Sequence, residues 1–141
     1  MQQTRIMGLD YGDVRIGIAL SDLSQTIASG IETRKCKGLD ADIAYISSLA
    51  KQNAVSLFVI GLPLNMDGTE GTRAEKTRAF GEALKSESNL DVVYQDERLT
   101  SVEAEEMLIS AGVRREKRKE LIDKVAATLI LESYLNNKHG G

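Results

Sequence analysis

The sequence predicts an α/β fold: a mixed five-stranded sheet, made of a three-strand antiparallel meander plus two parallel strands, with helices flanking it. Three observations lead to this prediction. Three short β-type runs, separated by turn residues, occupy the first 33 residues. From Asp40 onward, stretches with helical spacing alternate with further β-type runs. The run 57–60 (LFVI) is continuously apolar, which is typical of a parallel strand buried on both faces.

The elements are expected in the following order. Strands at 4–10 and 15–20 flank the turn residues Tyr11-Gly12-Asp13 and predict a hairpin, which a third strand at 26–33 extends. A helix follows, with apolar residues at positions 43, 46, 49 and 50 and with Asp40 as its N-cap. The strand at 57–60 then ends at Gly61-Leu62-Pro63, before a loop at 65–71 that is rich in turn residues.

The second half of the chain holds three more helices and one strand. Thr72 with Glu75 forms the pattern of a capping box and predicts a helix over 73–86. A strand at 91–95 leads to Thr100 and Glu103, a second capping box, and Gly112 ends the helix that this box opens. The charged segment 114–119 then leads into a final helix.

Composition favours one globular domain over residues 1–141, because domains of this size are common and 42% of the residues are hydrophobic. The formal net charge of −3 gives no sign of a nucleic-acid partner. No run approaches the ~18–20 apolar residues of a membrane span, and the N-terminus lacks the apolar core of a signal peptide. Cys36 is the only cysteine, which excludes an intrachain disulfide and favours a cytoplasmic location.

Several carboxylates lie at the ends of predicted strands or near the start of the final helix. Asp10 closes the first strand, and Asp96 and Glu97 close the last, so they can meet at the carboxyl edge of the sheet. Asp123 begins an apolar face of the final helix that continues with two alanines, and small side chains let a helix approach a sheet closely. Such a cluster without His or Cys suits Mg²⁺ or Mn²⁺, and two ions ~3.5–4 Å apart support phosphodiester hydrolysis.

Each acid also has a structural explanation. Asp10 could cap the hairpin turn, Asp96 could belong to an ordinary loop, and Asp123 could stabilise the positive end of its helix. Spacing alone therefore leaves open a metal-dependent enzyme and a non-catalytic RNA- or protein-binding module. A two-lobed sugar-kinase-like ATPase is disfavoured because 141 residues cannot supply both lobes.

Four segments resemble motifs of the YqgF/RuvX family, whose members have a ribonuclease-H-like fold. The segments follow in the family's order and cover most of the chain: 8–22 (GLDYGDVRIGIALSD), 61–69 (GLPLNMDGT), 96–105 (DERLTSVEAE) and 117–135 (KRKELIDKVAATLILESYL). The resemblance implies a small bacterial cytoplasmic nuclease associated with 5′-end maturation of precursor 16S ribosomal RNA. Such proteins were earlier proposed to be Holliday junction resolvases.

The resemblance also implies catalytic residues and metal ligands. Asp10 matches the family's first-strand acid and Asp123 its final-helix acid. We expect Glu97 to be the middle ligand, because the longer side chain better spans two strand spacings of ~9–10 Å, with Asp96 as a supporting or alternate ligand. The strand next to the first ends in Gly61 and supplies no acid of its own.

Several residues are candidates for holding nucleic acid. Arg15 and Arg98 could each grip a phosphate with two hydrogen bonds, although Arg98 could instead neutralise the acids beside it. The loop at 65–71 contributes Asn65 and Gly68 as candidate contacts. A basic rim is formed by Lys117, Arg118 and Lys119. The expected partner is structured precursor RNA on pre-ribosomal particles, or branched DNA, bound by a monomer or homodimer away from membranes.

Overall fold

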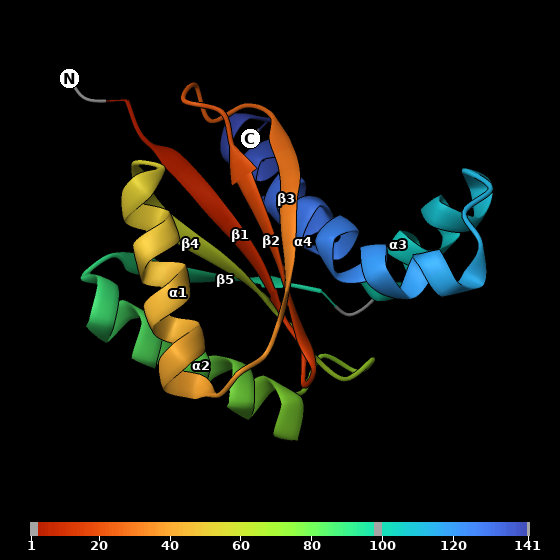
Figure 1. The fold of residues 1–141 in the computed structure, drawn as a ribbon, viewed down its shortest axis with the longest axis horizontal. Helices are drawn as coiled ribbons and strands as arrows, with labels where there is room; N and C mark the ends of the chain where they lie inside the picture. Colours follow the sequence, from red (N-terminus) through yellow and green to blue (C-terminus); the bar gives the residue numbers. More distant parts are fainter. Residues whose placement is uncertain (1–2, 98–99, 141) are drawn as a thin grey trace.

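The computed structural model describes residues 3–97 and 100–140 and confirms the predicted order of elements (Figure 1). The strands are β1 (Arg5–Tyr11), β2 (Arg15–Ser21), β3 (Ala28–Lys35), β4 (Val55–Leu62) and β5 (Asp91–Asp96). The helices are α1 (Leu39–Gln52), α2 (Thr72–Ser88), α3 (Thr100–Ser110) and α4 (Arg115–Gly140). The strand order is β3-β2-β1-β4-β5, antiparallel from β3 to β1 and parallel from β1 to β5.

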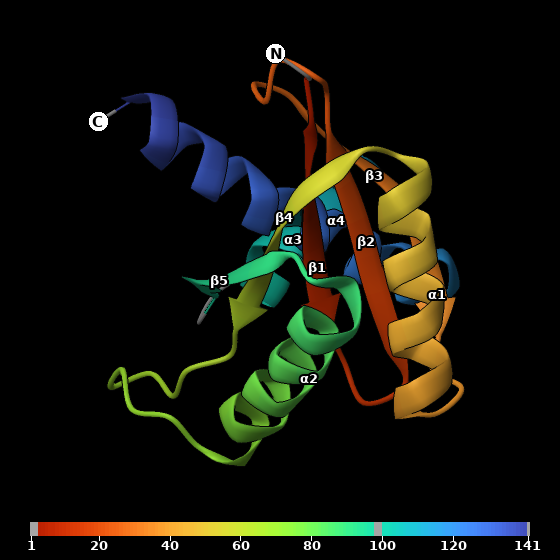
Figure 2. The same cartoon turned by 90° about the vertical axis from the view of Figure 1, so that its left-hand side faces the viewer.

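Helices cover both faces of this sheet, as the two ribbon views show (Figures 1 and 2). Helices α1 and α2 pack on one face, and α4 crosses the other, with α3 packed against α4. Alternation along β1 divides its side chains between two cores, because successive residues point to opposite faces. Met7 and Leu9 enter the core under α1 and α2, whereas Ile6 enters the core under α4.

Glycines on the α4 face of the sheet leave the space that α4 occupies. A Cβ on Gly8 of β1 would lie 2.7 Å from the Cβ of Leu131, and one on Gly17 of β2 would lie 1.8 Å from the carbonyl oxygen of Asp123. Glycines in β3 and β4 likewise face atoms of α4 closer than 3 Å. The helix therefore lies directly on the sheet backbone, and the close approach that two alanines of α4 predict is confirmed.

The predicted helix caps are wrong in detail. Helix α1 begins two residues early and α2 one residue early, with Gly38 and Gly71 at their N-caps and no side-chain hydrogen bond at either cap. Asp40 and Thr72 therefore lie inside the helices. Gly38 has a φ of 112°, which a residue with a side chain would adopt only with strain, so backbone conformation decides this boundary.

Two further boundaries are the end of α3 and the start of α4. Gly112, with a φ of 77°, ends α3 as predicted. The charged segment is mostly part of α4 and does not precede it, because the helix begins at Arg115.

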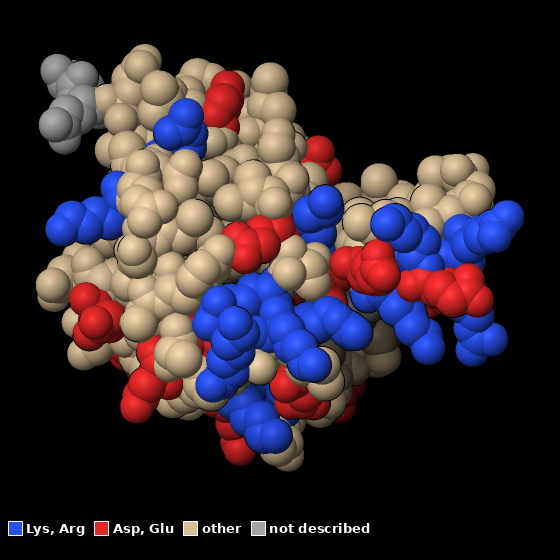
Figure 3. All heavy atoms as spheres, in the orientation of Figure 1, with Lys and Arg blue, Asp and Glu red and all other residues tan. Residues whose placement is uncertain are grey.

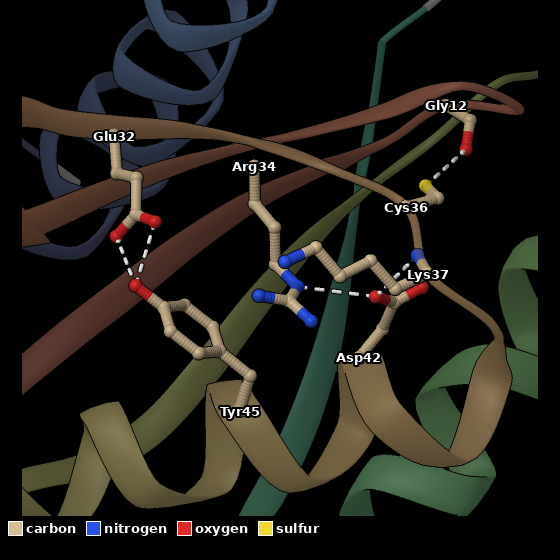
Figure 4. A network of polar contacts seen from close by, with 7 residues as sticks. All are labelled: Gly12, Glu32, Arg34, Cys36, Lys37, Asp42 and Tyr45. Atoms are coloured by element: carbon tan, nitrogen blue, oxygen red, sulfur yellow. Dashed lines mark hydrogen bonds and ion pairs between the residues drawn. The ribbon is translucent and has the colours of Figure 1, made fainter.

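A polar network fastens the end of β3 to α1 (Figure 4). The buried Asp42 accepts hydrogen bonds from Arg34 Nε at 3.1 Å and from the backbone N–H of Lys37 at 3.0 Å. Cys36 reaches the β1–β2 turn, donating its backbone N–H to the Val14 carbonyl at 2.8 Å. Burial raises the pKa of the Cys36 thiol, so this cysteine stays protonated and serves packing.

Candidate active site

The site is built around Asp10, the penultimate residue of β1. Alternation turns Asp10 to the α4 face together with Gly8, and the antiparallel register places Gly17 of β2 directly opposite it. Because Gly17 has no side chain, the backbone of α4 at Asp123 fills the space beside Asp10. Asp10 is only 8% exposed, so its carboxyl group is enclosed by protein on most sides.

Asp123 and Asp10 form a hydrogen-bonded carboxyl pair. Desolvation, the negative charge of Asp123 and this hydrogen bond together raise the pKa of Asp10 to about 7. Burial also raises the pKa of Asp123, while the hydrogen bond from Asp10 and the positive charge of Arg15 pull it down. Burial and the closeness of the two negative charges therefore favour a proton on this carboxyl pair when no cation is bound.

Glu97 reaches the same face from the end of β5, two strands away. Its backbone N–H donates to the Leu62 carbonyl at 3.2 Å, which continues the pairing of β5 with β4. Its Cδ lies 2.8 Å from the point where a Cβ of Gly61 would sit. The carboxyl group of Glu97 thus occupies the place over β4 where a side chain of β4 would otherwise stand.

Glu97 and its neighbour Asp96 lie differently with respect to the sheet. Burial, and after it the negative charges of Asp10, Asp96 and Asp123, raise the pKa of Glu97 to about 8. Asp96 pairs in register with Leu62, whose side chain alternates to the opposite face from Gly61. Asp96 still contributes charge and lines, with Glu97, a pocket of about 400 Å³ at this end of the sheet.

Arg73, near the start of α2, is a cation of the site that sequence reasoning missed. Its Nη2 donates to the Tyr11 carbonyl at 2.6 Å, and its Nη1 pairs with Asp13 in the hairpin turn. Its positive charge lowers the pKa values of Asp10 and Glu97 against the larger effect of burial. Its position one residue into the helix after the 65–71 loop was the available signal, because that loop leaves the carboxyl edge of the sheet.

The predicted basic rim lies in the first turns of α4, ahead of Asp123 in the same helix. Lys117 pairs with Glu120 at 3.4 Å, and Arg118 donates to the Val113 carbonyl at 3.0 Å, which fixes the α3–α4 turn. Lys119 is exposed. Figure 3 shows blue side chains along the protruding arm that α3 and the start of α4 form.

The loop candidates form a closed turn of their own. The backbone N–H of Asn65 donates to the Thr69 carbonyl at 2.8 Å, and its side-chain amide donates to the Thr69 hydroxyl at 3.0 Å. Gly68 adopts a φ of 89° within this turn. Arg98 lies outside the described residues.

The donor set fits a hard cation. Within residues 3–97 and 100–140, no three His, Cys, Asp or Glu side chains stand close enough together to hold a metal ion as they are. Buried carboxyl groups that raise one another's pKa are nevertheless under electrostatic strain, which protons or a divalent cation relieve. All three groups offer only oxygen atoms, the ligands that Mg²⁺ and Mn²⁺ prefer.

The chain is similar to known proteins in sequence and in fold. The family described as "RuvX: Holliday junction resolvase" matches residues 4–137. A "Putative pre-16S rRNA nuclease" from Caldanaerobacter subterraneus subsp. tengcongensis is 47% identical over 135 residues, covering 95% of this chain and 97% of the relative. A relative of the same name from Endomicrobium trichonymphae is 51% identical over 133 residues, covering 94% and 95% of the two chains.

Solved structures share the fold. RuvC of T. thermophilus in complex with a Holliday junction substrate aligns with a TM-score of 0.58 at 11% identity, over 97% of this chain and 96% of that one. The Fowlpox virus resolvase in complex with Holliday junction DNA aligns with a TM-score of 0.61 at 13% identity, over 96% and 99%. At these identities the likeness concerns the fold alone, and it confirms the predicted ribonuclease-H-like sheet and helices.

Proposed function

The chain belongs to the RuvX family, and on that premise we propose that it is a divalent-metal-dependent nuclease that hydrolyses phosphodiester bonds in nucleic acid. The observation that carries the proposal is the meeting of Asp10, Glu97 and Asp123 on one face of the sheet. These acids come from β1, from the residue after β5 and from α4, which are far apart in the sequence. Burying them together costs stability, so a chemical role explains their placement better than a structural one.

Each residue has a separate task in this proposal. Asp10, Glu97 and Asp123 would hold the cation, and Asp96 would support Glu97 through its nearby charge. Divalent cations such as Mg²⁺ or Mn²⁺, held by these residues, would supply activation of a water molecule and stabilisation of the leaving oxygen. Arg73 fixes the turn after Asp10 by its hydrogen bond to the Tyr11 carbonyl.

The preferred substrate is the precursor of 16S ribosomal RNA. This choice rests on relatives of that printed name, 46–51% identical over most of the chain. We place the protein in the cytoplasm, where precursor ribosomal particles are found; no described helix has the length and apolar character needed to cross a bilayer. Resolution of four-way DNA junctions is the second candidate, favoured by the family's description and by the fold of two junction resolvases.

The test compares cleavage of ribosome-associated precursor RNA and of a four-way DNA junction, with Mg²⁺, with Mn²⁺ and without either. Asp10→Asn, Glu97→Gln and Asp123→Asn should each abolish metal-dependent cleavage without unfolding the protein. Asp91→Asn, at the exposed opposite end of β5, is the matched control and should leave cleavage unchanged. Retained cleavage in all three site variants would exclude this site, and the substrate that is cut decides between the two candidates.

A further inference from the structure

A second basic surface lies on the β2 and β3 side of Asp10, whereas Glu97 lies on the β5 side. Arg15 of β2 and Lys35 of β3 are Cα partners in the antiparallel register, and alternation places Arg15 on the same face as Gly17. Gly17 lies against the backbone of Asp123, so Arg15, two residues before it in β2, stands beside the site. Across this edge of the sheet, basic residues therefore continue directly from the acids toward β3.

Two further lysines adjoin this pair through the hairpin turn. Lys37 follows Cys36, whose backbone N–H donates to the Val14 carbonyl in the turn. Lys76 of α2 lies 3.9 Å from Asp13 in the same turn. We call Arg15, Lys35, Lys37 and Lys76 the hairpin patch. Figure 3 shows Lys and Arg side chains gathered where the β1–β2 turn, the β3–α1 connection and the start of α2 meet.

The hairpin patch is not explained by folding. Like charges directly opposite each other on antiparallel strands destabilise a sheet, and Arg15 with Lys35 is such a pair. Among the described residues, the exposed side chains of Lys35 and Lys37 have no ion-pair partner to offset this cost. Asp13 balances only one end of the patch, and it is shared between Arg73 and Lys76. Asp123 offsets the charge of Arg15, whereas the charges of Lys35 and Lys37 have no such compensation among the described residues, which marks a functional position.

We propose that the hairpin patch binds backbone phosphates of the nucleic-acid substrate, so that the strand spans the acids with phosphate contacts on both sides. This inference rests on the proposed function and extends it. The α4 rim would hold one side of the cleaved bond and the hairpin patch the other. Exposed lysines on one edge recognise phosphate without reading bases, so the contact serves RNA and DNA alike.

Salt dependence of binding measures these contacts. The probes are a labelled precursor RNA stem and a labelled four-way DNA junction, bound in EDTA to prevent cleavage. Each phosphate contact contributes a slope of roughly 0.7–0.9 to log Kd against log salt. The double variant Lys35→Gln/Lys37→Gln should therefore lower the slope by about 1.4–1.8 and weaken binding at low salt. Lys35→Arg/Lys37→Arg should restore both.

The matched control is Lys51→Gln/Lys85→Gln, which removes two exposed lysines from the last turns of α1 and α2. It should leave the slope unchanged. Lys35→Gln should also leave the Tm equal or slightly higher, because it relieves the like-charge pair with Arg15; a structural role would lower the Tm.

The outcomes separate the two proposals. A lower slope with either probe supports the hairpin patch, even if the wild-type protein cleaves nothing and the proposed function fails. A slope equal to that of the control with both probes, or no binding by the wild-type protein, overturns it. If the wild-type protein still cleaves in Mg²⁺ while the slope is unchanged, the proposed function stands without this contact.

Discussion

The substitution Gly17→Ala tests whether backbone contact between β2 and α4 assembles the site. A Cβ at this position would lie 1.8 Å from the carbonyl oxygen of Asp123 and 2.3 Å from its carbonyl carbon. An ordinary contact begins at 3.4 Å, so the helix must retreat by about 1.6 Å. The opposing atoms belong to the backbone of α4 and cannot rotate away.

The expected cost has two parts. Overpacking of this kind lowers stability by about 1–3 kcal/mol. Displacement of a catalytic group by ~1 Å costs about 100-fold in rate, so we expect at least that loss of metal-dependent cleavage from the retreat of Asp123. Urea unfolding gives the first quantity, and single-turnover cleavage of precursor RNA, with calorimetric Mg²⁺ titration, gives the second.

Gly30→Ala is the matched control under the same helix. A Cβ on Gly30 meets side-chain atoms of Lys124 at 2.6 Å and of Thr128 at 2.7 Å, and its nearest backbone atom is the Lys124 carbonyl oxygen at 3.2 Å, so α4 needs to give by only a few tenths of an ångström. It should keep most of the cleavage rate. If Gly17→Ala folds, binds Mg²⁺ and cleaves like the wild-type protein, close seating of α4 is not what assembles the site, and the reasoning fails.

Three further predictions concern the acids and the β3–α1 network. Folding raises the pKa of Asp10 from 3.8 to about 7, so its protonated form contributes stability that is complete below about pH 4 and lost as the pH rises through 7. Asp10→Asn should therefore be more stable than the metal-free wild-type protein at about pH 8, by up to about 4 kcal/mol in urea unfolding; equal or lower stability would contradict the burial argument. Mg²⁺ binding near neutral pH should release protons, seen as a dependence of calorimetric heat on the buffer's ionisation enthalpy, and an absence of release would show that the acids are already ionised. Asp42→Ala leaves the buried Arg34 without its partner and should cost about 3 kcal/mol in urea unfolding, whereas Asp40→Ala, an exposed acid of the same helix, should cost little; similar losses would refute the network's role.

The prediction of the elements succeeded because local patterns carry it. Helical spacing, the buried run of β4 and the turn residues of the hairpin each require only neighbours in the chain. Helix starts were harder to predict, because Gly38 and Gly71 became the N-caps in place of better-known capping side chains. The preference for Glu97 over Asp96 rested on reach, and the structure adds the reason of space, since Gly61 leaves room for the longer side chain.

Arg73 and the glycines under α4 show why part of the site could not be predicted. A glycine in a strand reads as a weak point of the sheet until a crossing helix is known to lie against it. Arg73 is one charged residue among several on α2, and only the packing of α2 beside the β1–β2 turn brings it to the Tyr11 carbonyl. Both depend on contacts between residues more than 60 positions apart.

The sequence by itself determined the order of strands and helices, the acids at their ends and, through four motifs, the family. Tertiary structure alone decided how these acids meet. Burial and mutual repulsion at Asp10, Glu97 and Asp123 arise only when Gly17 and Gly61 admit α4 and the Glu97 side chain onto the sheet. The physical reason is that desolvation and charge coupling depend on distance in space, which the spacing of residues along a chain does not fix.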